Sequence, residues 1–65
     1  MKVFVNGEEK TVERACDVAA LVEELGLPAP AVLVEHNGVA LRRDEWAAAL
    51  AEGDRVEVLR IAAGG

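Results

Sequence analysis

Two Asn-Gly pairs, Asn6-Gly7 and Asn37-Gly38, restrict the fold more than any other feature of this sequence. Both residue types accept positive φ angles, which the two-residue turns of β-hairpins require, so each pair predicts a tight reversal between two strands. Ahead of the first pair, Met1, Val3 and Val5 alternate with Lys2 and Phe4, which is the pattern of a strand with Met1, Val3 and Val5 on one face. The sequence therefore predicts two hairpins, one in each half of the chain.

A single main helix is expected between the hairpins, beginning after Asp17, whose carboxylate can accept hydrogen bonds from the free amides of a first helical turn. Gly26 would end it, and the prolines at 28 and 30 would prevent it from resuming. Apolar residues recur between these limits at helical spacing and on one face: Val18, Leu21, Val22 and Leu25.

The other elements follow from alternation and turn residues. Strands are expected at residues 9–13 with Val12 inward, at 31–35 as a buried strand, at 39–41, and at 56–61. Asp44 is expected to cap a brief helical segment through Trp46 to Leu50, and residues 52–54 read as a turn. A sheet with one helix across one face is an α+β arrangement.

Size and charge exclude several classes of protein. Sixty-five residues form one domain with one small core, and no apolar run approaches the ~20 residues that span a bilayer. Lys2 precedes strand-like alternation instead of a secretory signal, and the single Cys16 excludes an internal disulfide, so a cytoplasmic protein is expected. The net charge of −5 argues against nucleic acid and is compatible with docking onto a basic protein groove.

The last four residues, Ala62-Ala63-Gly64-Gly65, are expected to form a flexible tail behind a domain of residues 1–61. Glycine has no Cβ, so this backbone can thread a narrow channel, and the Gly65 carboxylate has no side chain beside it. The strand just ahead of the tail would hold it on a rigid base. These properties suit a carboxylate that enters another protein's active site.

The chain resembles the ThiS family of sulfur carriers in thiamine biosynthesis. The resemblance rests on the strand–hairpin–strand–helix start, on Arg43-Asp44-Glu45-Trp46, on Gly53-Asp54, and on the apolar last strand before Ala-Gly-Gly. It implies a β-grasp, or ubiquitin-like, fold: a mixed sheet of about five strands with one main helix on one face. The first and last strands would lie side by side and parallel in the middle of that sheet.

The resemblance also implies a mechanism at Gly65. An E1-like adenylyltransferase would use ATP to convert the Gly65 carboxylate to an acyl-adenylate. A persulfide sulfur, supplied by a cysteine desulfurase or another donor, would displace AMP and leave a thiocarboxylate, which donates sulfur to thiazole synthase. The chain would then bind no cofactor itself, and would be a protein co-substrate of its partners rather than an enzyme.

Residue types within the chain also argue against catalysis. Cys16 and His36 are the only cysteine and histidine, and the expected topology does not bring them together. Cys16 is expected to be a small, partly buried residue at the helix start, where the helix N-terminus could lower its pKa. Trp46 reads either as a partner anchor or as a lid on the core. The acidic pairs lack clustered His or Cys, so no metal site is expected.

Alternation places Phe4, Leu59 and Ile61 on the sheet face away from the helix, and they are expected to form an apolar partner-binding patch that leads to the tail. Three readings of the function stay open. The first is the thiamine sulfur carrier. The second is a sister β-grasp carrier for molybdopterin, tRNA thiolation or cysteine synthesis, or a ubiquitin-like modifier. The third is an interaction domain with an inert tail.

Overall fold

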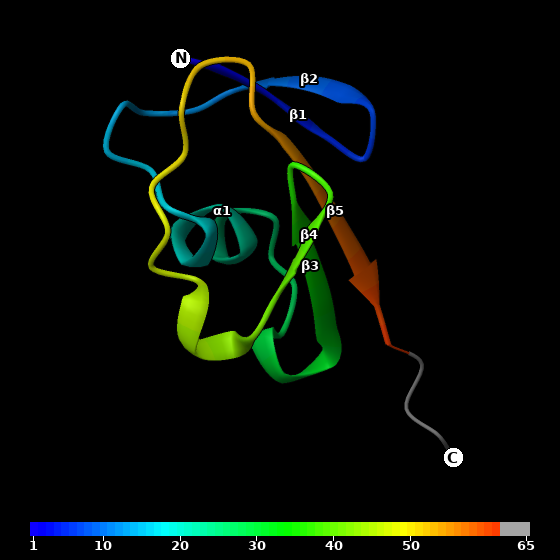
Figure 1. Ribbon diagram of the computed structural model, residues 1–65. Coiled ribbons are helices and arrows are strands. Elements are labelled where there is room, and N and C mark those ends of the chain that lie inside the picture. The colour runs from blue at the N-terminus through cyan, green and yellow to red at the C-terminus, as the bar shows by residue number, and fades with distance from the viewer. Residues whose placement is uncertain (62–65) are drawn as a thin grey trace.

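The structure, a computed structural model, describes residues 1–61 of the chain. One α-helix, α1 (Val18–Glu24), lies across one face of a five-stranded sheet, as Figure 1 shows, and this confirms the α+β expectation. The strands are β1 (Lys2–Val5), β2 (Glu8–Thr11), β3 (Val32–His36), β4 (Val39–Leu41) and β5 (Arg55–Arg60). Two 3-10 turns, η1 (Ala29–Ala31) and η2 (Arg43–Glu45), flank the β3–β4 hairpin.

The strand order across the sheet is β2-β1-β5-β3-β4. β5 lies at the centre, parallel to β1 and antiparallel to β3, while the two hairpins supply the outer strands. A parallel pair needs a connection that crosses the sheet, and α1 lies within that connection. The predicted parallel neighbours, the first and last strands, are thus confirmed.

Both Asn-Gly pairs form the predicted turns. Asn6 and Gly7 have φ angles of 51° and 82°, and Asn37 and Gly38 have φ angles of 50° and 83°. Two successive residues with positive φ give a turn whose twist matches that of the flanking strands, which fixes the register of each hairpin. Val12, expected inward, is buried just beyond the end of β2.

The start and end of α1 follow the expected capping chemistry. The Asp17 carboxylate accepts a hydrogen bond from the Ala20 amide at 2.8 Å. Gly26, with φ of 75°, ends the helix in a left-handed conformation that favours glycine. Leu21 is fully buried, whereas Leu25 lies at the C-cap and is only partly buried against the core.

The hydrophobic core lies between α1 and the sheet face that it covers. It consists of alternate residues of the central strands, three helical residues and a few side chains from the loops. These residues are Val3, Val5, Val12, Cys16, Val18, Leu21, Val22, Val32, Val34, Trp46, Leu50, Val56 and Val58.

The segment after β4 differs from the expectation. The predicted helix from Asp44 to Leu50 is wrong: only η2 is helical, and Asp44 lies inside it rather than at its start. The Glu45 carboxylate accepts from the Arg42 amide at 2.7 Å and so caps the start of this single turn. The Leu50 amide instead donates to the Cys16 carbonyl at 3.1 Å, so this part of the chain pairs with the segment ahead of α1.

Candidate functional site at the end of the central strand

β5 is held by hydrogen bonds along both of its edges. Five of its residues pair with β3, and the Ile61 amide continues this contact by donating to the Ala31 carbonyl at 2.7 Å. On the other edge, β1 ends early and the Asn6 side chain takes over its role. That amide accepts from Val58 N at 2.7 Å and donates to Val58 O at 3.2 Å. The backbone is therefore fixed as far as Ile61.

The predicted reactive residue, Gly65, and the other tail residues Ala62, Ala63 and Gly64 lie outside the described residues. The chain reaches them directly after Ile61, at the end of the central strand of the sheet. The predicted tail therefore begins at a backbone position that hydrogen bonds to β3 and Ala31 hold in place.

Two of the three predicted patch residues lie together on the open face of the sheet. Leu59 is 55% exposed and Ile61 is 45% exposed, so both face away from the core as expected. Leu33 of β3, which is 57% exposed, stands directly opposite Leu59 in the strand register. The structure therefore adds Leu33 to the apolar surface at this end of the sheet.

Phe4 lies apart from these residues. It also faces away from the helix, but its register partner on β5 is Arg55, four residues ahead of Leu59. It is half-buried, and the Arg55 guanidinium lies 5.7 Å from the centre of its ring. The predicted patch is therefore divided. Phe4 lies beside the Arg55 guanidinium in one part of the open face, and the exposed side chains of Leu33, Leu59 and Ile61 lie in another.

Leu33 was missed because residues 31–35 were read as a buried strand, whereas β3 is buried on one face only. Val32 and Val34 are buried, while Leu33 and Glu35 are exposed. The charge of Glu35 was the available signal: a residue two positions from Leu33 shares its face, so a glutamate there marks that face as open to water.

The candidate nucleophile and base have separate partners. Cys16 is buried beside the start of α1, and its thiol donates to the Asp17 carbonyl at 3.4 Å. Burial raises the pKa of the Cys16 thiol, and nearby carboxylates including Glu24 raise it further. The surroundings of Cys16 therefore favour the neutral thiol. His36 instead pairs with Asp54 at 2.7 Å.

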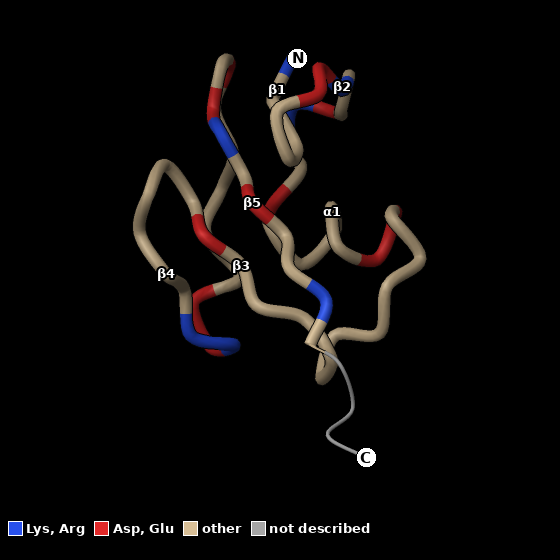
Figure 2. The backbone as a smooth tube through the Cα atoms, turned by 90° about the vertical axis from the view of Figure 1, so that its right-hand side faces the viewer, with Lys and Arg blue, Asp and Glu red and all other residues tan. Residues whose placement is uncertain are grey.

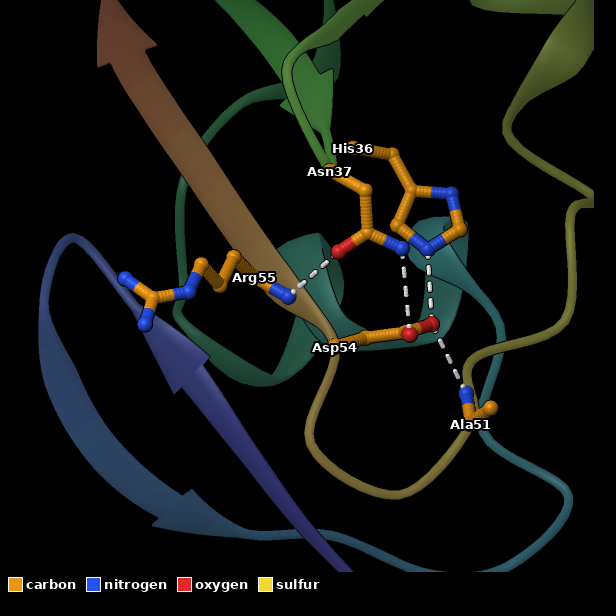
Figure 3. Close-up of polar contacts among 5 residues, drawn as sticks. All are labelled: His36, Asn37, Ala51, Asp54 and Arg55. Carbon is orange, nitrogen blue, oxygen red and sulfur yellow. Dashed lines mark hydrogen bonds and ion pairs between the residues drawn. The ribbon is translucent and has the colours of Figure 1, made fainter.

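Asp54 is the centre of a small polar cluster that fixes the start of β5, as Figure 3 shows. Its carboxylate contacts His36, accepts from the Asn37 side chain at 3.1 Å, and accepts from the Ala51 amide at 2.8 Å. The Asn37 side chain in turn accepts from the Arg55 amide at 2.8 Å. Partial burial would raise the pKa of Asp54, but these hydrogen bonds outweigh it and lower that pKa. The cluster binds the β3–β4 turn to the loop before β5.

Trp46 belongs to the core rather than to the surface. It is 3% exposed, and the Arg43 guanidinium lies 4.5 Å from the centre of its ring. The indole Nε1 is buried and has no hydrogen-bond partner among residues 1–61. The reading of Trp46 as a lid on the core is therefore confirmed. Its indole N–H is buried without forming a hydrogen bond to the described residues.

A metal site and a membrane-spanning helix were both unexpected from the sequence, and the described part of the chain can be examined for each. Within residues 1–61, no group of three or more His, Cys, Asp or Glu side chains is placed to hold a metal ion. Over the same residues, no helix is long and apolar enough to cross a membrane.

Comparison with known proteins gives consistent results. The model of the ThiS family matches residues 3–65. The crystal structure of thiamine biosynthesis protein ThiS from Geobacter metallireducens is 36% identical, covers 100% of both chains and has a TM-score of 0.84. A solution structure of a thiamine biosynthesis protein from the same organism has a TM-score of 0.82 at 36% identity, over 100% of this chain and 88% of that one.

A longer relative also contains a similar segment. The thiazole synthase of Paramagnetospirillum magneticum is 35% identical over 66 residues, which is 100% of this chain and 20% of that protein. The chain thus spans about a fifth of the length of this curated relative. The family match over residues 3–65, together with the same mixed sheet and helix as in the solved ThiS structure, shows that the chain belongs to the ThiS family and has its β-grasp fold.

Proposed function

We propose that this chain is a sulfur carrier protein that delivers sulfur to the thiazole ring of thiamine. The observation that carries the proposal is the family match, which extends to Gly65. The geometry supports it, because a backbone hydrogen-bonded as far as Ile61 gives the last four residues a fixed base. In this proposal, residues 1–61 form the domain that the partners recognise, and residues 62–65 form the tail that carries the reactive carboxylate.

The chemistry is that of carboxylate activation. A carboxylate is a poor acyl electrophile, so an E1-like adenylyltransferase first joins the Gly65 carboxylate to AMP, consuming ATP and releasing pyrophosphate. A persulfide sulfur then attacks the acyl carbon and AMP leaves. Cleavage of the remaining sulfur–sulfur bond by a thiol gives the Gly65 thiocarboxylate, which is the nucleophilic sulfur donor.

In this proposal the chain is a protein co-substrate and not an enzyme. It contributes the carboxylate and the surface that its partners recognise, while ATP is bound by the adenylyltransferase. Cys16 supports this assignment, because a thiol with a raised pKa is a weak nucleophile at neutral pH. His36 supports it as well, since it pairs with Asp54 while the Cys16 thiol donates to the Asp17 carbonyl, so the two do not form a nucleophile–base pair.

Thiazole synthase is the proposed sulfur acceptor. A segment 35% identical to the whole of this chain forms part of a protein named thiazole synthase. Two domains joined in one polypeptide meet at a high effective concentration, which favours direct transfer of sulfur from the carrier domain to the synthase domain. The persulfide donor would be a cysteine desulfurase or a similar enzyme, and the cytoplasm, where ATP is available, is the proposed compartment.

Phe4, Leu59 and Ile61 are proposed to contact the adenylyltransferase. Leu59 and Ile61 support this role because they are exposed apolar side chains next to the start of the tail. Leu33 joins them through its pairing with Leu59. Exposed apolar surface of this kind is costly in water and usually marks an interface.

Intact mass spectrometry tests the proposed function. The chain is incubated with ATP, its cognate adenylyltransferase and a persulfide donor. We expect a mass increase equal to the replacement of one oxygen by sulfur, located in the C-terminal peptide and absent when ATP is omitted. Incubation of the product with thiazole synthase and its substrates should return the chain to its original mass. A thiocarboxylate that only a molybdopterin, tRNA or cysteine pathway enzyme consumes would favour the sister carriers instead.

A further inference from the structure

The open face of the sheet carries two neighbouring cross-strand pairs on β3 and β5. Leu33 stands opposite Leu59, and two residues along the same strands Glu35 stands opposite Glu57. All four side chains are exposed. Figure 2 shows the acidic segments in the middle of both strands, and Figure 1 shows that α1 lies on the other side of the sheet. We call these four residues the leucine–glutamate surface.

Like charges directly opposite each other destabilise a sheet, so the Glu35–Glu57 pair does not help this fold. Neither carboxylate forms an ion pair with any cation among residues 1–61. The register partner of Glu35 on β4 is Ala40, which has no charge. The two carboxylates are therefore left without compensation by the described part of the chain.

Arg55 is the cation that could have compensated Glu57, because it lies two residues away on the same face of β5. Its guanidinium instead lies over the Phe4 ring, 5.7 Å from the ring centre. The nearest cationic side chain on the strand is thus engaged with Phe4, and the leucine–glutamate surface stays both apolar and negatively charged.

We propose that the leucine–glutamate surface docks a basic protein surface, in which an apolar side chain meets Leu33 and Leu59 while an Arg or Lys lies between Glu35 and Glu57. The proposal rests on the carrier function above and names the adenylyltransferase as this partner. Charge complementarity supports it, since two uncompensated carboxylates on a chain of net charge −5 attract a cation and repel an acidic competitor. Within residues 1–61, no third His, Cys, Asp or Glu side chain joins these two carboxylates in a group that could hold a metal ion.

The test is the dissociation constant between this chain and its cognate adenylyltransferase, measured by calorimetry at low and high salt. The variant is the double change Glu35→Gln and Glu57→Gln, which keeps size and removes charge. We expect the dissociation constant to rise about tenfold at low salt, and its salt dependence to weaken. Glu23→Gln on α1 makes the same chemical change on the opposite side of the sheet, and should alter the dissociation constant less than about twofold.

A measurement without any partner separates a binding role from a structural one. Because the double variant removes a repulsion, its urea midpoint should equal or exceed that of the wild type. A lower midpoint would mean that the two glutamates stabilise the fold, and would overturn the proposal. An unchanged dissociation constant would overturn it as well, as would weakening by Glu23→Gln to the same degree.

The docking proposal and the proposed function can fail separately. If wild-type chain is adenylated but the double variant binds as tightly as wild type, the docking proposal is wrong and the carrier function stands. If the chain binds through the two glutamates but is never adenylated, the carrier function is wrong and the surface stands. If the wild type neither binds nor is adenylated, both are wrong.

Discussion

The two faces of the sheet are built from the same strands but have opposite properties. On the face toward α1, Val56 and Val58 of β5 are 0% and 5% exposed. On the other face the same strand presents Leu59, which is 55% exposed. Strand alternation alone separates these residues, so one strand contributes to the core and to the exposed surface at once.

The difference shows how a short chain can divide its apolar residues between stability and recognition. A domain of this size buries only about 60% of the surface that its unfolded chain exposes, so each buried side chain matters. Leucines left in water at one end of the sheet do not contribute to that core. Their position beside the end of β5 fits the proposed contact with a partner, because exposed apolar surface of this kind usually marks an interface.

Leu21→Ala should have the largest effect on stability, because Leu21 is fully buried between α1 and the sheet. We expect the free energy of unfolding to fall by about 2–5 kcal/mol, from the lost burial and the cavity that remains. Urea denaturation measures this loss. Leu59→Ala is the matched control on the open face and should cost less than about 0.5 kcal/mol. Equal losses from both changes would break the comparison of the two faces.

Asp54→Asn should have an intermediate effect, since an amide NH2 group replaces one of the two carboxylate oxygens that contact His36, Asn37 and Ala51. We expect a loss of about 1–3 kcal/mol at pH 7, because the negative charge is removed and at least one of these groups, among them the part-buried His36, loses its acceptor. Asp44→Asn is the control, because the Asp44 side chain is 73% exposed and should change the free energy of unfolding by less than about 0.5 kcal/mol.

The pH dependence of stability identifies the Asp54 contribution. The pKa of Asp54 is lowered in the folded state, so its carboxylate stabilises the fold fully above the unfolded-state pKa of about 4. That contribution is lost as the pH falls through the folded-state pKa. Urea midpoints measured between neutral and acidic pH should fall less in Asp54→Asn than in the wild type. Parallel curves for the two proteins would show that Asp54 does not have this role.

Leu59→Asp should have the smallest effect on stability, with a melting temperature close to that of the wild type, because the side chain is already in water. The same change should weaken binding to the adenylyltransferase about tenfold or more, since a charge would enter a desolvated apolar contact. Calorimetric titration and thermal unfolding give the two values independently. A variant that unfolds would place Leu59 in the core, and one that binds normally would show that the apolar surface is not an interface.

The sequence predicted the parts of the fold that local chemistry determines. The two Asn-Gly turns and the Asp17 cap each depend on a few neighbouring residues, and all three are confirmed. The parallel pairing of β1 and β5 joins residues about fifty positions apart, and it came from the family resemblance rather than from any local pattern.

The errors arose where distant contacts decide the conformation. The segment from Asp44 to Leu50 has helical spacing, but burial of Trp46 and the bond between Leu50 and Cys16 end the helix after one turn. At the candidate site, alternation predicted that Leu59 faces outward, while its contact with Leu33 depends on the pairing of β3 with β5. Strand register of that kind is set by the whole sheet and cannot be read from either strand alone.

The central claim is that the chain acts through the carboxylate of Gly65, and ATP–pyrophosphate exchange by the cognate adenylyltransferase tests it most directly. The wild type should support exchange, and Leu59→Asp should support it only at raised concentrations of the chain. A chain that lacks Gly65 should support none at any concentration, while its urea midpoint stays that of the wild type, because residues 1–61 form the core. Full exchange by the shortened chain would contradict the account.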